Sequence, residues 1–275
     1  MKKRVKNALI SELSDMLSFK RPARSKTEDI FIRHYLDGID GMRTDGYGNR
    51  FIEIGKEPSV LYSCHTDTVH HNAGFQRIVR DGDIIELHRN EGANCLGADC
   101  STGVWLMLNM IKRKRPGLYI FHRDEEVGGF GSEYIASKTP YLLQGILAAI
   151  AFDRKGTTNV ITHQAGLRGA SNAFAWSLAD ILPGGYSPDS TGVFTDTANY
   201  TEIIPECSNI SVGYHLAHGP GEYQEIRHAL HLLEALCDLR HNDLVIERDP
   251  FAFNDYGRGA WSYYYEDENR EVLAW

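Results

Sequence analysis

The chain has 275 residues and a formal net charge of -8, with 24% charged and 42% hydrophobic residues. This length suits one large α/β domain with a full core, and the two fractions are ordinary for a globular protein. The negative charge argues against a nucleic-acid partner, and no stretch approaches the roughly 20 apolar residues that span a membrane, so we expect no membrane either. The five cysteines form no CxxC pair, which is typical of a reduced, cytoplasmic protein.

Strand-like and helix-like segments alternate along the chain. Residues 1–19 start with basic residues as a signal peptide does, but Glu12 and Asp15 interrupt the apolar stretch, so we expect an amphipathic helix. Residues 102–114 and 222–239 have the spacing and terminal charges of helices. The short apolar runs that are typical of buried strands are "PSVLYSC", "GLYIFH", "ILAAIAF", "NVITH" and "CSNISVGY".

This alternation predicts an α/β fold with a mostly parallel central sheet sandwiched by helices, in a single domain over residues 1–245. Residues 246–275 differ in composition, being aromatic, acidic and rich in glycine. We expect them to form an extension that packs on or beside the domain, and a role in self-association stays open.

Polar residues follow most of the predicted strands. In sheets of this type ligands bind beyond the carboxyl ends of the strands. Each residue alone fits a helix cap, a turn or an ordinary histidine. Together, however, several carboxylates at one edge of a sheet repel one another, and a bound cation resolves that repulsion. The candidates are His65 and Asp67, then Asp124, Glu125 and Glu126, then Asp153, then His215 and His218, with Asp99 in a glycine-bounded turn before a predicted helix.

The residue types narrow the choice of cation. Imidazole together with carboxylate suits Zn²⁺, or Co²⁺ or Mn²⁺, better than an all-oxygen site for Ca²⁺ or Mg²⁺. The candidates come from five segments, and one ligand from each already gives five. Five ligands are too many for one catalytic zinc, so two ions that share a carboxylate fit the count. Because Glu125 and Glu126 are adjacent, they point in different directions from an extended strand end, which leaves one of them as an acid or base beside the metal.

The motifs "HTDTV", "LGADCSTGV", "DEEVGGFGS", "AFD" and "HGPGEY", in this order, resemble the motif series of the co-catalytic di-zinc exopeptidases and amidohydrolases. That superfamily includes leucyl and glutamyl aminopeptidases, peptidase T and acetylornithine deacetylase. The resemblance covers most of the chain and implies a zinc aminopeptidase-like, three-layer α/β/α fold. It further implies that Asp67 orients the ligand His65, and that Glu125 is the general base for a metal-activated water in amide hydrolysis. The implied metal ligands are His65 and Asp153 for one ion, Glu126 and His218 for the other, and Asp99 as the bridge.

Two positions of the family pattern can be assigned in more than one way in this sequence. His218, rather than His215, matches the family pattern of a histidine, a small residue and a following acid, which leaves His215 behind the ligands, facing substrate or on the surface. Cys100 stands where many relatives have a second aspartate, after a peptide bond that is often cis in the family; we keep Asp99 as the bridge and leave open whether Cys100 weakens metal binding. His70 and His71 are expected at the rim of the site or in solvent.

His218 follows Asp153 by 65 positions, too few for the lid domain that some relatives insert there, so we expect a lidless enzyme whose loops select the substrate. The expected function is metal-dependent exopeptidase activity, aminopeptidase-like, on small peptides. A deacylase or amidase of a small N-acylated amine is the alternative within enzymes, and a catalytically silent, metal-containing peptide-binding module is the alternative from another class. A homo-oligomer stays open. The substrate-binding candidates are Arg168, Asp196, Tyr200 and His215, with turn, cap or surface roles as alternatives.

Overall fold

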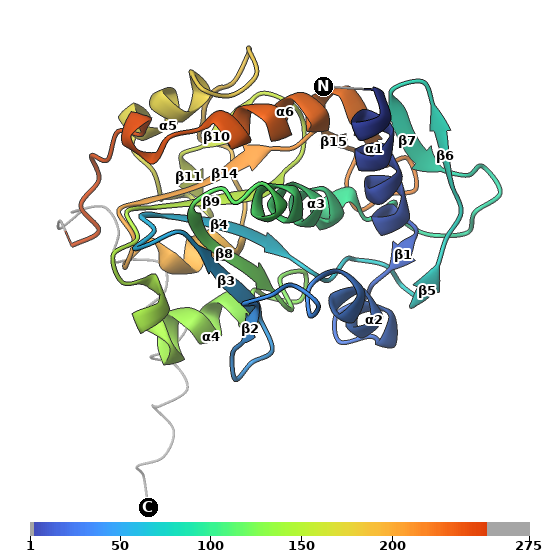
Figure 1. The fold of residues 1–275 in the computed structure, drawn as a ribbon, viewed down its shortest axis with the longest axis horizontal. Helices are drawn as coiled ribbons and strands as arrows, with labels where there is room; N and C mark the ends of the chain where they lie inside the picture. The colour runs from blue at the N-terminus through green and yellow to red at the C-terminus, as the bar shows by residue number, and fades with distance from the viewer. Residues whose placement is uncertain (1–2, 252–275) are drawn as a thin grey trace, which may run out of the picture.

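An eight-stranded mixed sheet forms the centre of the molecule, in the order β13-β10-β14-β9-β4-β8-β3-β2 (Figure 1). The computed structural model describes residues 3–251. The four central strands, β14, β9, β4 and β8, run parallel to one another, whereas β3 and β10 pair antiparallel with β8 and β14. The prediction of a mostly parallel sheet is therefore confirmed for its centre. The strands are β2 (Arg43–Thr44), β3 (Arg50–Ile54), β4 (Val60–His65), β8 (Gly117–His122), β9 (Ala148–Arg154), β10 (Asn159–Ile161), β13 (Ser187–Asp189) and β14 (Glu206–Ser211).

Helices cover both faces of this sheet. On one face α3 (Ala98–Lys112) packs against β4 and β9, and α1 (Lys3–Leu17) and α6 (Ile226–Asp238) pack against α3 (Figure 1). Because α3 lies between the sheet and two helices, nearly all of its residues are buried and most of them are apolar. The other face has a second apolar core that includes residues of α4 (Phe130–Lys138) and of the short helices η1 (Pro140–Leu143) and η2 (Asp196–Tyr200). The remaining helices are α2 (Lys26–Tyr35), α5 (Asn172–Ala179) and η3 (His241–Asp243).

A smaller, four-stranded sheet in the order β15-β16-β7-β6 lies beside the main one. It joins β6 (Ile78–Asp81) and β7 (Ile84–Leu87) to β15 (Tyr214–His215) and β16 (Tyr223–Glu225). The prediction of a helix over 222–239 is therefore wrong at its start, because the main chain of β16 pairs with β7 and α6 begins only at Ile226. Two short pairs complete the strands: β1 (Phe19–Lys20) with β5 (Gly74–Phe75), and β11 (His163–Gln164) with β12 (Leu167–Arg168).

The segment between Asp153 and His218 forms strands of the main sheet, the β11–β12 pair and α5, so in the described part of the chain it holds no separate lid domain. The fold is a single mixed α/β domain. None of the helices in residues 3–251 combines the length and the apolar character needed to cross a membrane. The aromatic segment predicted to pack on the domain lies, from residue 252 onward, outside the described residues.

Candidate metal centre

The carboxyl ends of three parallel strands meet at one edge of the sheet, as the sequence predicted. β4 lies between β9 and β8, and its last residue, His65, is in register with His122 at the end of β8. Glu125 and Glu126 follow β8, and Asp153 is the penultimate residue of β9. The parallel register therefore brings together side chains that are far apart in the sequence.

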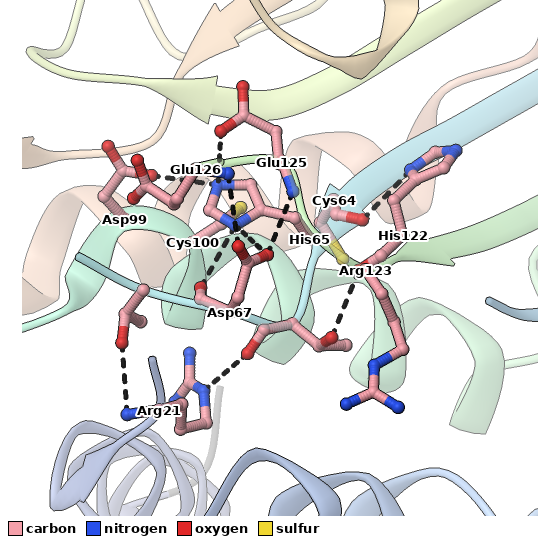
Figure 2. Close-up of polar contacts among 12 residues, drawn as sticks. Arg21, Cys64, His65, Asp67, Asp99, Cys100, His122, Arg123, Glu125 and Glu126 are labelled. Carbon is pink, nitrogen blue, oxygen red and sulfur yellow. Dashed lines mark hydrogen bonds and ion pairs between the residues drawn. The ribbon is translucent and has the colours of Figure 1, made fainter. Parts of the chain in front are cut away.

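His65 is at the centre of the first cluster. Its side chain is fully buried, and its Nε2 lies 3.1 Å from Asp99 Oδ1, 3.3 Å from Asp153 Oδ1 and 3.9 Å from Glu125 Oε2. Figure 2 shows Asp99 and Glu125 beside the imidazole ring. Three carboxylates thus surround one ring nitrogen.

His218 forms the second cluster with Asp99 and Glu126. Its Nε2 lies 3.2 Å from Asp99 Oδ2 and 3.4 Å from Glu126 Oε2. The two oxygens of Asp99 therefore lie next to two different histidines, Oδ1 near His65 and Oδ2 near His218. Asp99 is thus the residue that the two clusters share.

The charges of the centre favour cations. Hydrogen bonds to Asp99 and then to Glu126 raise the pKa of His218 to about 11. Burial disfavours the charged form of His65, but Asp153 and its other neighbours still raise the pKa of that imidazole well above its ordinary value. One oxygen of Glu126, Oε1, is buried without a hydrogen-bond partner. Negative charge strong enough to raise the pKa values of two histidines also attracts a divalent ion.

The donor set fits two such ions. In residues 3–251 three groups of His, Cys, Asp or Glu side chains converge closely enough to hold a metal, and all three lie in this centre. Histidine nitrogen with carboxylate oxygen is a donor set of zinc and its neighbours. The groups are His65 with Cys100 and Asp153, His65 with Glu125 and Glu126, and Asp99 with Glu126 and His218.

Asp67 lies behind His65 and holds two parts of the centre. Nδ1 of His65 is 3.1 Å from the Asp67 main-chain carbonyl and 3.4 Å from its Oδ1. The Asp67 carboxylate also accepts hydrogen bonds from the main-chain N–H groups of Glu125 and Glu126, each at 3.2 Å (Figure 2). Although burial opposes ionisation, the hydrogen bond from His65, together with the main-chain N–H of Glu126, keeps the pKa of Asp67 below its ordinary value. The sequence predicted the first contact and missed the second.

Cys100 follows Asp99 across a cis peptide bond. Its side chain is fully buried and its thiol donates a 3.0 Å hydrogen bond to the main-chain carbonyl of Phe152. Burial raises the pKa of this thiol well above its ordinary value. Although Sγ lies near donor atoms of His65 and Asp153, its hydrogen bond is to the backbone of β9.

Glu222 holds the turn that carries Asp99. Its buried carboxylate accepts main-chain hydrogen bonds from Leu96, Gly97 and Ala98 at 2.8 to 3.1 Å, and one from Asp99 at 3.4 Å. Since α3 lacks a side-chain cap at Gly97, Glu222 satisfies N–H groups at the start of this helix. The motif "HGPGEY" contains this acid, but its spacing alone does not reveal the contact.

Two further residues support the ligands and were missed. Thr195 donates a 2.7 Å hydrogen bond from Oγ1 to Asp153 Oδ2. Arg21 is fully buried below the cluster, where Nε donates to the Thr66 carbonyl at 2.7 Å and Nη2 to Ser101 Oγ at 2.9 Å (Figure 2). Arg21 therefore ties the end of β4 to the start of α3. No motif in the sequence marks either residue.

A cavity of about 430 Å³ opens onto the centre. Asp99, Glu125, Glu126, Asp153 and His218 line it, so four of the candidate ligands and the candidate base are accessible to a small substrate, whereas His65 is buried beside them. Its other lining residues are of two kinds: apolar ones such as Ile161, Val193 and Phe194, and polar ones that include Arg154, Lys155 and Gln164.

No model of a protein family and no curated protein matches the sequence. Solved structures do match the fold. Aminopeptidase PepT from Bacillus cereus is 13% identical, with a TM-score of 0.63 over 84% of this chain and 97% of that chain. A tripeptidase from Staphylococcus aureus is 12% identical, with a TM-score of 0.64 over 85% and 97%. The TET1 peptidase of Pyrococcus horikoshii is 15% identical, with a TM-score of 0.61 over 83% and 98%. The chain has the aminopeptidase fold. The fold that the motif resemblance implied is thus confirmed.

The aminopeptidase fold places two predicted substrate-binding residues beneath the centre. Asp196 and Tyr200 are fully buried. Asp196 Oδ2 lies 3.2 Å from His122 Nδ1, and the Tyr200 hydroxyl lies 2.7 Å from His122 Nε2. Neither side chain lines the cavity, and both contact the buried His122.

The other two candidates lie beside the site. Arg168 is exposed and donates to a main-chain carbonyl at 3.3 Å. His215 pairs with Glu225 at 2.7 Å and stacks on Tyr223. Neither lines the cavity of this aminopeptidase fold.

His70 corrects another prediction. His71 is exposed, as expected, but His70 is buried, with Nδ1 2.7 Å from Thr68 Oγ1 and Nε2 3.0 Å from Gln76 Oε1. Burial lowers the pKa of His70 to about 4, so this histidine is neutral and structural.

Proposed function

We propose that the chain is a metal-dependent hydrolase that cleaves amide bonds as an aminopeptidase-like exopeptidase. One observation carries the proposal: Asp99 presents one oxygen to His65 and the other to His218, beside the accessible carboxylate of Glu125. Aminopeptidases and a tripeptidase among the structures with this fold support the choice of an exopeptidase.

The proposed ions are two divalent cations, Zn²⁺ with Co²⁺ or Mn²⁺ as alternatives. Bound cations supply Lewis-acid activation of a water molecule and of the scissile carbonyl. The residues proposed to hold them are His65 and Asp153 for one, Glu126 and His218 for the other, and Asp99 for both.

Glu125 is the proposed general base. Burial, partly offset by His65, raises its pKa well above the ordinary value, and Asp153 contributes to the rise. A raised pKa makes this carboxylate a stronger proton acceptor. Glu125 accepts a proton from the attacking water as the oxygen of that water bonds to the carbonyl carbon. It returns the proton to the amine nitrogen as the C–N bond breaks. Asp67 holds the main chain of Glu125 in place during these steps.

The first experiment measures metal content by elemental analysis. We expect about two equivalents of a transition metal in the wild type after zinc loading, and reduced content in His65→Ala and His218→Ala, because each removes a ligand. His215→Ala is the matched control and keeps its metal, since His215 pairs with Glu225 instead. A wild type that binds neither zinc nor cobalt contradicts the proposal.

The second experiment tests the base. Glu125→Gln should keep metal and fold but reduce amide hydrolysis by about a thousandfold, because general base catalysis typically contributes factors of 10² to 10⁴. Glu133→Gln, an exposed position on α4, is the control. The substrates are aminoacyl anilides and N-acyl amines, so the screen also separates an aminopeptidase from a deacylase. If the metal-loaded wild type cleaves none of them, the binding-module alternative is favoured.

Two wider features belong to the proposal. All five cysteines are buried and unpaired, which supports a reducing compartment such as the cytoplasm. The TET1 peptidase can assemble into a tetrahedron or a large octahedral shell, and on that basis we propose self-association of this chain, to be tested by light scattering.

A further inference from the structure

Two basic residues directly follow the candidate ligand Asp153. Arg154 ends β9, Lys155 comes next, and both line the same cavity as the carboxylates of the metal centre. Arg154 is half-buried and Lys155 is exposed. The cavity therefore combines a centre that attracts cations with two positive charges of its own.

The guanidinium of Arg154 keeps hydrogen-bonding capacity for a ligand. Its Nη2 donates to Thr191 Oγ1 at 2.9 Å, and its Nε is buried without a partner. Among the ion pairs of residues 3–251, which extend to 4.0 Å, none involves Arg154 or Lys155. An unpaired donor on a half-buried arginine costs free energy that an acceptor on a ligand can recover.

The acids near Arg154 are engaged elsewhere. Asp189 is the acid whose charge interacts with Arg154, yet its Oδ1 already accepts from Thr191 and its Oδ2 from Asn159. Asp153 is a candidate metal ligand that also accepts from Thr195. With the acids of the centre proposed to bind metal, Arg154 and Lys155 are the positive charges of the cavity lining that form no ion pair with a described residue.

We propose that Arg154 and Lys155 bind a carboxylate of the substrate, so that the enzyme prefers acidic peptides. This proposal rests on the proposed function and names its substrate class. Arginine suits the role because its planar fork can donate two parallel hydrogen bonds to a carboxylate. The carboxylate is either the side chain of an N-terminal Asp or Glu, or the free C-terminus of a di- or tripeptide.

The test compares the p-nitroanilides of Glu and Gln, which differ in charge but hardly in shape. The metal-loaded wild type should cleave the Glu substrate with a kcat/KM about tenfold higher, and Arg154→Gln and Lys155→Gln should each lower that ratio, because a partly desolvated ion pair is lost. Arg240→Gln removes an exposed charge far from the cavity lining and serves as the control.

A second comparison identifies the source of the carboxylate. Dipeptides with a free C-terminus are compared with the same dipeptides amidated. A preference for the Glu anilide assigns the site to an N-terminal acidic side chain, whereas a preference for the free over the amidated dipeptide assigns it to the chain end. Equal rates in both comparisons, or preferences that survive in Arg154→Gln and Lys155→Gln together, overturn the proposal.

A binding measurement separates this proposal from the proposed function. L-Glutamate and L-glutamine are titrated calorimetrically into the metal-loaded protein, which requires no turnover. Tighter binding of glutamate that is lost in Arg154→Gln supports the carboxylate site even if no amide is cleaved. Equal binding of the two ligands, together with equal binding of a free and an amidated dipeptide, contradicts it even if neutral anilides are hydrolysed.

Discussion

Two histidines three residues apart, His215 and His218, have different environments. His218 adopts a left-handed backbone conformation with φ of 67° and lies beside Asp99, whereas His215 stands in the short strand β15 and pairs with Glu225. The family motif favoured His218, which the structure places beside Asp99 and Glu126, and composition alone could not make that choice. At this scale the neighbours of a residue decide its chemistry.

Cys100 is the residue whose effect the sequence left open. Its thiol donates to the carbonyl of Phe152 in a fully buried position. We predict that Cys100→Ser is well tolerated because a hydroxyl can make the same donation. Cys100→Asp should lower the free energy of unfolding by about 2 kcal/mol or more, since it places a buried carboxylate against a carbonyl oxygen. Urea unfolding of both variants checks this, and equal stability of Cys100→Asp and the wild type would contradict it.

At the scale of elements, the start of α3 depends on an acid from a distant loop. Glu222 precedes β16, yet its carboxylate accepts the main-chain N–H groups that lead into α3 and position Asp99. Burial, followed by the charge of Asp99, raises the pKa of Glu222 to about 7, while the N–H donors oppose that rise. The contact between Glu222 and these N–H groups therefore joins the loop before β16 to the turn that carries Asp99.

We predict that Glu222→Gln lowers the free energy of unfolding by about 2 kcal/mol, because an amide NH₂ replaces one of the acceptor oxygens and faces N–H donors. The same change should weaken metal affinity by displacing Asp99, which chelator competition measures. Glu225→Gln, three residues along and paired only with His215 among the described ion pairs, is the control. An unchanged metal affinity in Glu222→Gln would show that the turn holds without this acid.

At the scale of the whole molecule, the parallel order of β9, β4 and β8 concentrates acids at one edge of the sheet. A cation bound there links the ends of these strands with the loop that carries His218. Ligands that bind only the folded state stabilise it, so metal loading should raise the melting temperature and a chelator should lower it.

Metal affinity should fall as the pH falls. The pKa of His218 is raised to about 11 and that of His65 also lies well above its ordinary value. Below these values each imidazole holds a proton that a metal ion must displace, so lower pH opposes binding. We predict that affinity drops by about tenfold per pH unit for each proton released between pH 8 and pH 6. Competition with a chelator at several pH values measures the slope, and an affinity that does not change with pH is incompatible with histidine ligands.

Much of the fold and of the metal centre follows from the sequence. Apolar runs bounded by Gly, Pro or charge identify strands, and an acid or histidine directly after such a run identifies the edge where a parallel sheet collects its ligands. His65, Glu126 and Asp153 are placed by this local rule, which needs only the order of residues along the chain. This rule did not identify the small sheet, because Tyr223–Glu225 becomes a strand by pairing with β7 and β15.

The lining of the cavity was decided by the tertiary structure. Arg168, Asp196 and Tyr200 have suitable chemistry, but the fold buries the last two and leaves Arg168 outside the cavity. No role was predicted for Arg154 from the sequence, although it directly follows a predicted ligand and lines the cavity. Glu222 reaches the start of α3 across more than a hundred residues. Strand ends follow from local sequence because burial and hydrogen bonding act on neighbouring residues, whereas cavity lining and long-range contacts depend on how distant segments pack.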